Sequence, residues 1–493
     1  MYKTRNNQSI DIKNIPVQTM TDAISDILSC ASNGNRPILM FTDNSKNPNY
    51  LYIVIANDSE SSLSVFVADC TNIRSYPSMS NAFPAFHLFE RELWEETGIF
   101  PEGHPWLKPV RYAYDRNKAV SEMIDYPFYA VNGEEIHEVG VGPVHAGVIE
   151  PGHFRFQCKG EDVLHLEIQL GYQHRGIERM FEHAGFKNLI PTAESIAGDS
   201  VMAHTWAHAQ CLENLMGIMI PKRADHIRAI ALEMERAAIH IGDLGAIAND
   251  IAYQMGMAVF SANRTLIINS SLLLCGSRLS RGLIKYGGVH FDIDDEKCQT
   301  LVYIIDTIEK AVSQAAEVMF ATPSVLSRLE KTGTVEQSVA AAIGMVGPAA
   351  RASGLPADIR TDHSYGPYSM MPIHMVHLES GDVYARTYIR YLEIKESFRW
   401  IRNALQHLPA TELCIKPTAV MPNKLSLSIT EGWRGETVHA AVTDTEGTIV
   451  RYKIKDPSFN NWFALALAVR NNAISDFPLC NKSFNLSYCG HDL

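Results

Sequence analysis

The chain has 493 residues, of which 46% are hydrophobic and 20% charged, proportions typical of a globular protein long enough for more than one domain. Its formal net charge of −12 argues against a nucleic-acid-binding protein and against unaided binding to anionic lipid. No run reaches the roughly 18 apolar residues of a membrane-spanning helix, and the opening MYKTRNNQSIDIKN lacks the apolar core of a secretory signal.

Nine cysteines are scattered singly along the chain, and no two have Cys-x-x-Cys spacing. The sequence therefore shows neither a zinc-knuckle nor an iron–sulfur-cluster framework. An odd number of dispersed thiols is typical of a reducing compartment in which most thiols are buried. We expect a cytoplasmic chain, with any contact to a membrane made through partners.

Residues 1–115 predict a small α+β domain. The runs 51–55 and 63–67 are rich in β-branched residues and are bounded by Asn, Asp and Ser, which is typical of short strands. Strand patterns precede the first strong helical pattern, and this order favours an α+β arrangement. Residues 116–138 are polar, acidic and weakly periodic, and they predict a linker.

A charged stretch closes this first domain at residues 86–112, with the sequence FHLFERELWEETGIFPEGHPWLKPVRY. Its Glu and Arg side chains lie on a predicted helix, where they can form directional ion pairs with a partner. We therefore predict a docking helix. The alternative is an ordinary charged helix that faces solvent.

Residues 139–493 predict a mainly α-helical bundle domain with small flanking β-sheets. Alternating Phe154, Phe156 and Val163 indicate paired strands divided by a turn at Lys159-Gly160. From Lys222 onward, apolar residues recur every three or four positions, as in an amphipathic helix. Further helical stretches cover residues 261–281, 294–320 and 383–407. Strand patterns return in the tail at residues 425–429, 437–441 and 448–454.

The stretch 171–215 has the most distinctive pattern in the chain. It opens on HRG at 174–176, continues with a helical run, and breaks at ESIAGDS, residues 194–200, before a second helical pattern. Two further motifs follow, GPAARASG at 347–354 and EGWRGE at 431–436.

On the second of these helices His204 and His208 lie four residues apart and share one face. Together with Asp199 and His491 they could approach a metal ion. The glutamate of the HExxH zinc motif is absent, however, and we expect no metal at this pair.

These motifs carry a resemblance to a known family. The stretch 171–215 and the motifs at 347–354 and 431–436 resemble the [NiFe]-hydrogenase large subunit and the complex I 49-kDa subunit. The stretch 86–112 is similar to the signature of the complex I 30-kDa subunit. Its matching residues are Glu90, Arg91, Glu92, Gly98, Ile99, Gly103, His104 and Pro105. The chain thus resembles a fusion of the two subunits, similar to the metal-free large subunits of the hydrogenase-4 type, with a hydrogenase large-subunit-like fold.

The resemblance also implies what has been lost. Hydrogenases hold nickel and iron with four cysteine thiolates, because soft ligands hold soft metals. The matching positions here are Ala197, Ser200, Ser487 and Gly490, and Cys489 lies one residue out of register. We therefore expect that the chain holds no nickel and binds no cofactor of its own.

The family further implies a partner small subunit that holds a [4Fe-4S] cluster. By resemblance, Arg175 and His240 should lie beside this cluster, where a fixed charge and an imidazole would influence its potential. The alternative for Arg175 is an internal ion pair with an acid such as Glu178.

Five further residues are candidates for the walls of the former metal cavity: His145, His153, Asp199, His204 and Arg434. In hydrogenases the arginine of the EAPRGE motif faces the metals. Without metals, Arg434 could instead line a polar cavity or pair with Asp199.

We therefore expect a subunit of a membrane-associated, ion-translocating redox complex. It would pack against the iron–sulfur small subunit and couple electron transfer to membrane-arm subunits of the complex I and antiporter type. A quinone-reducing subunit, with His145 or His153 and the loop at Gly198 near the quinone, is the second hypothesis. A purely structural scaffold is the third. The complex I resemblance also leaves an association with NAD open, and the electron donor and acceptor are not identified.

Overall fold

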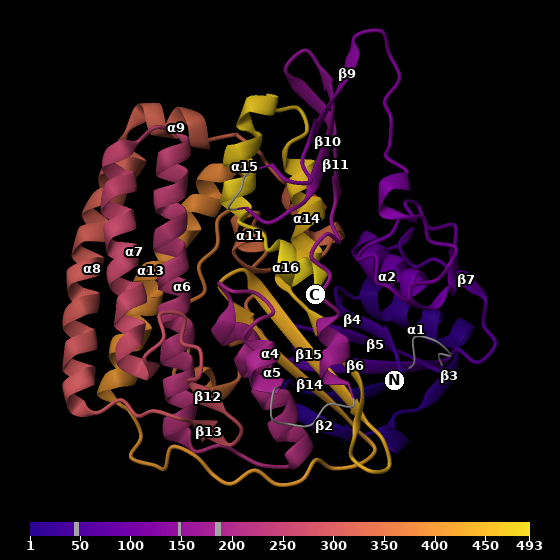
Figure 1. Cartoon of the computed structure of the whole chain (residues 1–493), viewed down its shortest axis with the longest axis horizontal. Coiled ribbons are helices and arrows are strands. Elements are labelled where there is room, and N and C mark those ends of the chain that lie inside the picture. Colours follow the sequence, from indigo (N-terminus) through magenta and orange to yellow (C-terminus); the bar gives the residue numbers. More distant parts are fainter. Residues whose placement is uncertain (44–48, 146–148, 183–188) are drawn as a thin grey trace.

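A computed structural model describes residues 1–43, 49–145, 149–182 and 189–493. A four-stranded sheet lies at the centre of the molecule, with a long-helix bundle on one side and the N-terminal α+β region on the other (Figure 1). The mixture of helices and small sheets confirms the general fold class expected from the sequence. The stretch 171–215 is described apart from residues 183–188.

The N-terminal region is built on a five-stranded sheet. Its path is β1 (Tyr2–Thr4), β6 (Ser62–Asp69), β5 (Tyr50–Asn57) and β4 (Arg36–Thr42), and β3 (Val17–Thr19) pairs in parallel with β6. Successive strand residues point to opposite faces, and both faces of β5 are buried. One face packs in a core with α1 (Met20–Ser32) and α2 (His87–Thr97), and the other packs toward the rest of the chain.

The central sheet has the order β16 (Ile449–Lys455), β15 (Gly435–Thr443), β14 (Lys424–Gly432) and β2 (Gln8–Asp11). The helix α5 (Val201–Met216) packs on β14 and β15. The strand β2 is antiparallel to β14, and Lys424 Nζ lies 2.9 Å from the Asp11 carboxylate. The strand β2 lies within the predicted domain 1–115, but its partner strand β14 lies far away in the sequence.

Four long helices form the bundle: α6 (Lys222–Asp250), α7 (Gln254–Cys275), α8 (Asp295–Ala321) and α13 (Val383–Gln406). The helices expected from periodicity at Lys222, 294–320 and 383–407 are confirmed within a residue or two. The side chains of Asp294 and Asp382 cap α8 and α13 by accepting backbone N–H groups. The helix α7 begins seven residues before the expected stretch 261–281, and it ends six residues before the expected boundary at 281 because Gly276 adopts a left-handed conformation with φ of 73°.

A three-stranded sheet stands out from the body at the top of Figure 1. Its order is β11 (Asp162–Gln169), β10 (His153–Lys159) and β9 (Ile136–Val141). The expected turn at Lys159-Gly160 is present, with Gly160 at φ 59°. The predicted linker 116–138 is largely irregular, but its last three residues already belong to β9.

Among the described residues, α7 alone is long and apolar enough, by length and composition, to cross a membrane. A run of this length was not expected from the sequence, because Asn263, Arg264 and other polar residues interrupt the apolar pattern. Only 33% of its most apolar 18-residue window is buried, and α7 packs against α6 and α8 in the bundle.

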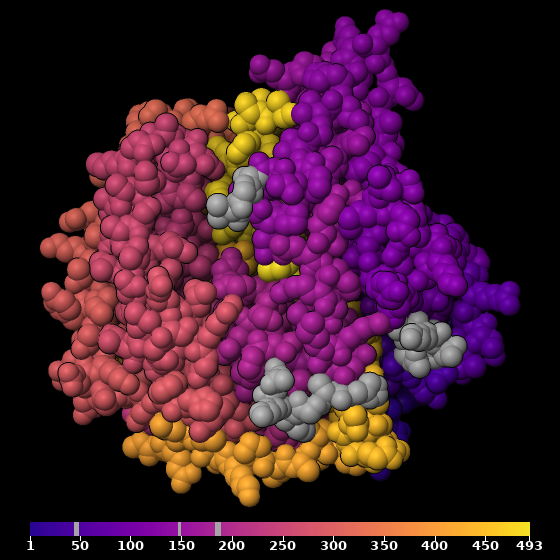
Figure 2. Space-filling model, in the orientation of Figure 1, coloured from indigo at the N-terminus to yellow at the C-terminus, as the bar shows by residue number. Residues whose placement is uncertain are grey.

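The remaining elements are short. In chain order they are η1 (Ile12–Asn14), β7 (Ser75–Pro77), η2 (Pro84–Phe86), β8 (Phe100–Glu102), η3 (Met123–Asp125), α3 (Ile177–Phe181), α4 (Leu189–Ala193), β12 (Ile284–Lys285), β13 (Gly288–Val289), α9 (Pro323–Leu329), α10 (Gln337–Ala342), α11 (Gly347–Ala352), α12 (Ile359–Asp362), η5 (Gly366–Ser369), α14 (Pro457–Ala468), η6 (Ile474–Asp476), α15 (Phe477–Phe484) and α16 (Tyr488–Asp492). In Figure 2 the yellow C-terminal segment is visible on this face, between magenta residues and the helical bundle.

Candidate functional site

The charged helix α2 is buried where the N-terminal region, residues 1–115, packs against the central sheet. Lys453 Nζ, from β16, lies 2.5 Å from a Glu92 carboxylate oxygen, and Arg451, from the same strand, lies 3.0 Å from Glu96. Arg111 also pairs with Glu92. Glu90, Arg91, Glu92 and Glu95 are all buried. The alternative of a helix in solvent is therefore wrong: α2 docks, and the surface it docks on belongs to the same chain.

The positions that match hydrogenase thiolates come together and are filled by protein. Ser200 Oγ accepts a hydrogen bond from Arg434 at 3.2 Å, and Ser487 Oγ accepts one from the Gly490 N–H at 2.9 Å. A Cβ atom added to Gly490 would lie 2.7 Å from the Asp456 carboxylate. Ala197 is fully buried. A carboxylate thus lies where a side chain at position 490 would project, and this set of residues does not fit a nickel–iron centre.

Arg434 and Asp199 form a two-pronged ion pair beside these positions. The two guanidinium nitrogens lie 2.6 and 2.7 Å from the two carboxylate oxygens. The guanidinium also lies 3.9 Å from the centre of the Trp433 ring, and the Trp433 indole N–H donates to the Asp199 carbonyl. The pairing of Arg434 with Asp199 considered from the sequence is therefore present, and Asp199 is partly exposed to solvent.

His204 and His208 do share one face of α5, but their ring nitrogens bind protein groups. His204 contacts the Asp456 carboxylate at 2.9 Å and His439 at 3.1 Å. His208 contacts the hydroxyls of Tyr452 at 2.7 Å and Tyr286 at 2.8 Å. Within the described part of the chain, no group of three His, Cys, Asp or Glu side chains is arranged to hold a metal ion. His491 lies apart from this pair, against Asp492 and Phe459.

Arg175 joins the two segments that contain the lost ligand positions. Its guanidinium donates to the carbonyls of Ser195 at 2.7 Å and Ile196 at 2.8 Å, and it also reaches the Cys489 carbonyl at 3.4 Å. Its side chain is exposed. Glu178 instead lies 3.1 Å from Lys453, so the alternative of an Arg175–Glu178 pair is wrong.

His240 lies on α6 and is fully buried. Its Nε2 atom lies 2.9 Å from Glu393, and its Nδ1 atom lies 3.1 Å from Arg390. Nδ1 also lies 3.8 Å from Asp243, whose carboxylate accepts a hydrogen bond from Asn485. The Asn485 carbonyl in turn accepts one from Arg434 at 2.6 Å. Short contacts thus connect His240 to the Arg434–Asp199 pair; its position beside a partner's cluster stays a prediction.

Comparison with known proteins follows the same division of the chain. The profile of the family described as "Respiratory-chain NADH dehydrogenase, 49 Kd subunit" matches residues 250–426, and that of the corresponding "30 Kd subunit" matches residues 20–120. Formate hydrogenlyase subunit 5 of Escherichia coli (strain K12) is 30% identical over 442 residues, which cover 85% of this chain and 77% of the relative. The chain belongs to the fused 30-kDa and 49-kDa subunit family.

Two further comparisons are consistent with this family. Hydrogenase-4 component G of Escherichia coli (strain K12) is 29% identical to this fused subunit, over 84% of this chain and 75% of the relative. A chain of the membrane-bound sulfane sulfur reductase (MBS), described as an archaeal respiratory membrane complex, aligns with a TM-score of 0.68 and 21% identity. It covers 74% of the fused subunit and 100% of its own length, and at this identity it indicates a shared fold alone.

The two hairpin histidines of the fused subunit have different surroundings. The His145 ring lies 3.4 Å from the Tyr488 hydroxyl, beside the segment with Ser487 and Gly490, and burial lowers its pKa. His153 contacts the Gly142 carbonyl, and its ring packs on Phe128 of the predicted linker. Of the two, His145 is thus the one that adjoins the former metal cavity. Gly198 lies in the loop expected near a quinone, but as a glycine it has no side chain that could contact one.

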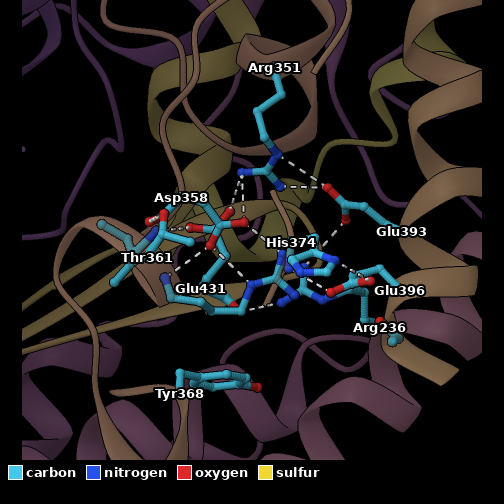
Figure 3. Close-up of polar contacts among 12 residues, drawn as sticks. Arg236, Arg351, Asp358, Thr361, Tyr368, His374, Glu393, Glu396 and Glu431 are labelled. Atoms are coloured by element: carbon cyan, nitrogen blue, oxygen red, sulfur yellow. Dashed lines mark hydrogen bonds and ion pairs between the residues drawn. The ribbon is translucent and has the colours of Figure 1, made fainter. Parts of the chain in front are cut away.

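A buried ionic network connects the two family motifs to α6 and α13. Figure 3 shows Arg351 between Glu393 on one side and Asp358 with Glu431 on the other. Arg351 lies 2.7 Å from Glu393 and 2.9 Å from Glu431. Arg360 lies 2.6 Å from Asp358. Burial raises the pKa of Glu431 to about 7. The network includes Glu233, Arg236, Arg351, Asp358, Arg360, Glu393 and Glu431, all of them buried, and it reaches His240 through Glu393.

Most of this network could not be predicted from the sequence. Arg351 and Glu431 belong to recognisable motifs, but Glu233, Arg360 and Glu393 lie in segments where a charge normally indicates a solvent-facing position. The only signal was within α6, where charged residues interrupt a pattern that is apolar on nearly every side of the helix.

Glu235 provides a test of the electrostatics of this site through pH. It accepts a hydrogen bond from the Met202 N–H at 2.8 Å, and burial, with the nearby Asp199 charge, raises its pKa to about 8. Between about pH 4.5 and pH 8 the folded protein therefore keeps a proton that the unfolded chain releases, so this group makes the protein less stable as pH rises. We expect Glu235→Gln to be more stable than the wild type at pH 8, by on the order of 1 kcal/mol, and to show little gain at pH 5.

The measurement is the free energy of urea unfolding at both pH values. The exposed Glu317 of α8 provides the control, as Glu317→Gln. An equal gain for both variants at pH 8 would argue against a Glu235 that keeps its proton in the folded protein.

Proposed function

We propose that this fused subunit is the non-metal-binding, hydrogenase-like large subunit of a membrane-associated, ion-translocating redox complex. The observation that carries the proposal is the replaced metal site, in which the Asp456 carboxylate lies against Gly490 and Arg434 binds Ser200. The names of its relatives, formate hydrogenlyase subunit 5 and hydrogenase-4 component G, support membership of such a complex. The subunit would lie peripherally on the cytoplasmic face of the membrane, held by its partners.

The proposed partner is a small subunit with a [4Fe-4S] cluster, next to the exposed guanidinium of Arg175. Three backbone carbonyls bind this guanidinium, which would hold its charge in a fixed position. A fixed positive charge stabilises a reduced cluster and so raises its potential. His240, connected to the same site through Arg434, would allow this potential to respond to protons. The membrane-arm partners, of the complex I and antiporter type, would use the resulting coupling.

The test is Arg175→Gln in the whole complex, purified from membranes, with a redox titration followed by electron paramagnetic resonance. Removal of one positive charge about 8 Å from a cluster, at an effective dielectric constant of about 20, should lower the midpoint potential by on the order of tens of millivolts. The matched control is Arg179→Gln, one turn further on, where an exposed arginine pairs with Asp115.

An unchanged potential in an assembled complex would favour the purely structural scaffold. Absence of an iron–sulfur subunit from the purified complex would remove the proposed partner. Stoichiometric nickel with hydrogen uptake would overturn the proposal as a whole. A quinone-reducing subunit has less support than this proposal, because His153 packs on Phe128 away from the former metal cavity and Gly198 has no side chain that could bind a quinone.

A further inference from the structure

A continuous row of hydrogen-bonding side chains runs from the former metal site to a pocket at the surface. It begins at the Asp456 carboxylate, which lies against Gly490. In order, its members are Asp456, His204, His439, Tyr452, His208 and Tyr286. The five successive contacts between them measure 2.9, 3.1, 2.8, 2.7 and 2.8 Å. Every link is within hydrogen-bonding distance.

The row crosses the interface between α5 and the central sheet, which pack together in Figure 1. His204 and His208 come from α5, His439 from β15 and Tyr452 from β16. These four residues have no exposed surface. Hydrogen-bonding groups of this kind are costly to bury unless they are satisfied, and the row satisfies all of them with one another.

The last member, Tyr286, lines a pocket of about 650 Å³. Other residues around this pocket are Glu194, His290, Cys414 and Lys416. His290 and Lys416 are exposed and Tyr286 is partly exposed, so the pocket lies at the surface and the Tyr286 end of the row borders it. The opposite end, at Asp456, is almost completely buried.

The donors and acceptors of the row fit together in one direction without a gap. Burial lowers the pKa of His208 to about 3 and also lowers that of His439, so both rings are neutral, with one N–H and one free nitrogen each. In one order, Tyr286 donates to His208, His208 to Tyr452, Tyr452 to His439, His439 to His204, and His204 to Asp456. The reversed order is equally complete once one more proton is present on the Asp456–His204 pair.

We propose that this row is a proton-transfer path between the surface pocket at Tyr286 and the buried Asp456. A proton from water in the pocket binds the Tyr286 oxygen as the Tyr286 O–H proton passes to His208. Each later member gives up one proton and receives one, and the last proton arrives on Asp456. One N–H or O–H bond breaks for each that forms, and no group changes its oxidation state. The path gives the fused subunit its own proton route to the site beside Arg434.

This inference goes beyond the proposed function and does not depend on the identity of the partners. It is tested on the full chain by NMR, with ¹⁵N-labelled histidine, through the rate at which ring N–H protons exchange with water. Tyr452→Phe removes one oxygen from the middle of the row. We expect exchange at His204 and His439 to slow by at least tenfold, while exchange at His208, still joined to Tyr286, keeps its wild-type rate.

Tyr391→Phe is the matched control, because Tyr391 is a buried tyrosine of α13 outside the row, and it should change none of the three rates. Tyr286→Phe removes the hydroxyl at the pocket end and should slow ring N–H exchange at His204, His208 and His439. It replaces Tyr452→Phe as the test variant if that variant folds poorly. Wild-type rates at His204 and His439 in both row variants would overturn the path, and so would equal slowing of all three histidines in Tyr452→Phe. The two proposals can fail separately. If Arg175→Gln shifts the cluster potential while ring N–H exchange stays unaltered in Tyr452→Phe and Tyr286→Phe, the path is rejected and the proposed function stays in place.

Discussion

Replacement of Arg351 by methionine should lower the free energy of unfolding by about 3–5 kcal/mol, the range observed when one partner of a buried ion pair is removed. Arg351 is fully buried between Glu393 and Glu431, and its guanidinium also lies 3.5 Å from Asp358. Methionine has a similar length but no charge, so these carboxylates would lose a shared cation. Water cannot replace it, because the network is closed to solvent.

Urea denaturation followed by circular dichroism measures this loss. The control is Arg399→Met on the same helix as Glu393, because Arg399 is an exposed arginine that pairs with Glu396. We expect its cost to stay below about 1 kcal/mol. The cost of Arg351→Met should also shrink at pH 5, since the carboxylates left behind can then take up protons. Similar losses for both arginines would show that burial of the network contributes little.

The second large effect is expected at the contact between the two halves of the chain. Lys453 is buried and lies 2.5 Å from Glu92 of α2 and 3.1 Å from Glu178 of α3. Lys453→Met would leave two buried carboxylates with less compensating charge, at a cost of about 3 kcal/mol. Because α2 docks through these charges, residues 1–112 should loosen before the helical bundle does.

Hydrogen exchange with mass spectrometry distinguishes the two regions. In Lys453→Met we expect faster exchange across α1, α2 and the N-terminal sheet, with little change in α6 and α13. Lys310→Met, at an exposed lysine of α8, is the control. Addition of Glu92→Gln to Lys453→Met should restore part of the loss, because the orphaned acid is then neutral. Uniform exchange changes over the whole chain would contradict docking through α2.

Helices of the bundle were predictable because their apolar residues recur with the period of a helix over 22 to 29 residues. The hairpin turn at Gly160 was predictable from local chemistry. In contrast, pairing of β2 with β14 depends on two segments more than 400 residues apart, and no local pattern contains that information. The charges of α2 correctly indicated docking, but only the folded chain identifies the surface on which α2 docks.

The residues of the candidate site also fall into two groups, those that local sequence motifs predict and those that only the folded chain brings together. Motifs predicted Arg175, Arg434 and Asp199, and the structure brings these residues to the two segments that carry the lost thiolate positions. His439 and Tyr452 lie on strands of ordinary composition, so nothing local indicates that they meet His204 and His208. Such rows arise from the register of β15 against β16 and from the way α5 crosses them.

The β2–β14 pairing also has a consequence for biosynthesis. From Asp11, the end of β2, to Lys424, the start of β14, the chain grows by 424 − 11 = 413 residues. At about 5–20 residues per second, the ribosome needs roughly 20–80 seconds to make this length. Throughout that interval the nascent β2 has no strand to pair with, even though its neighbours β1 and β3 can already join β6. The backbone of β2 therefore stays without its partner strand until β14 has been made.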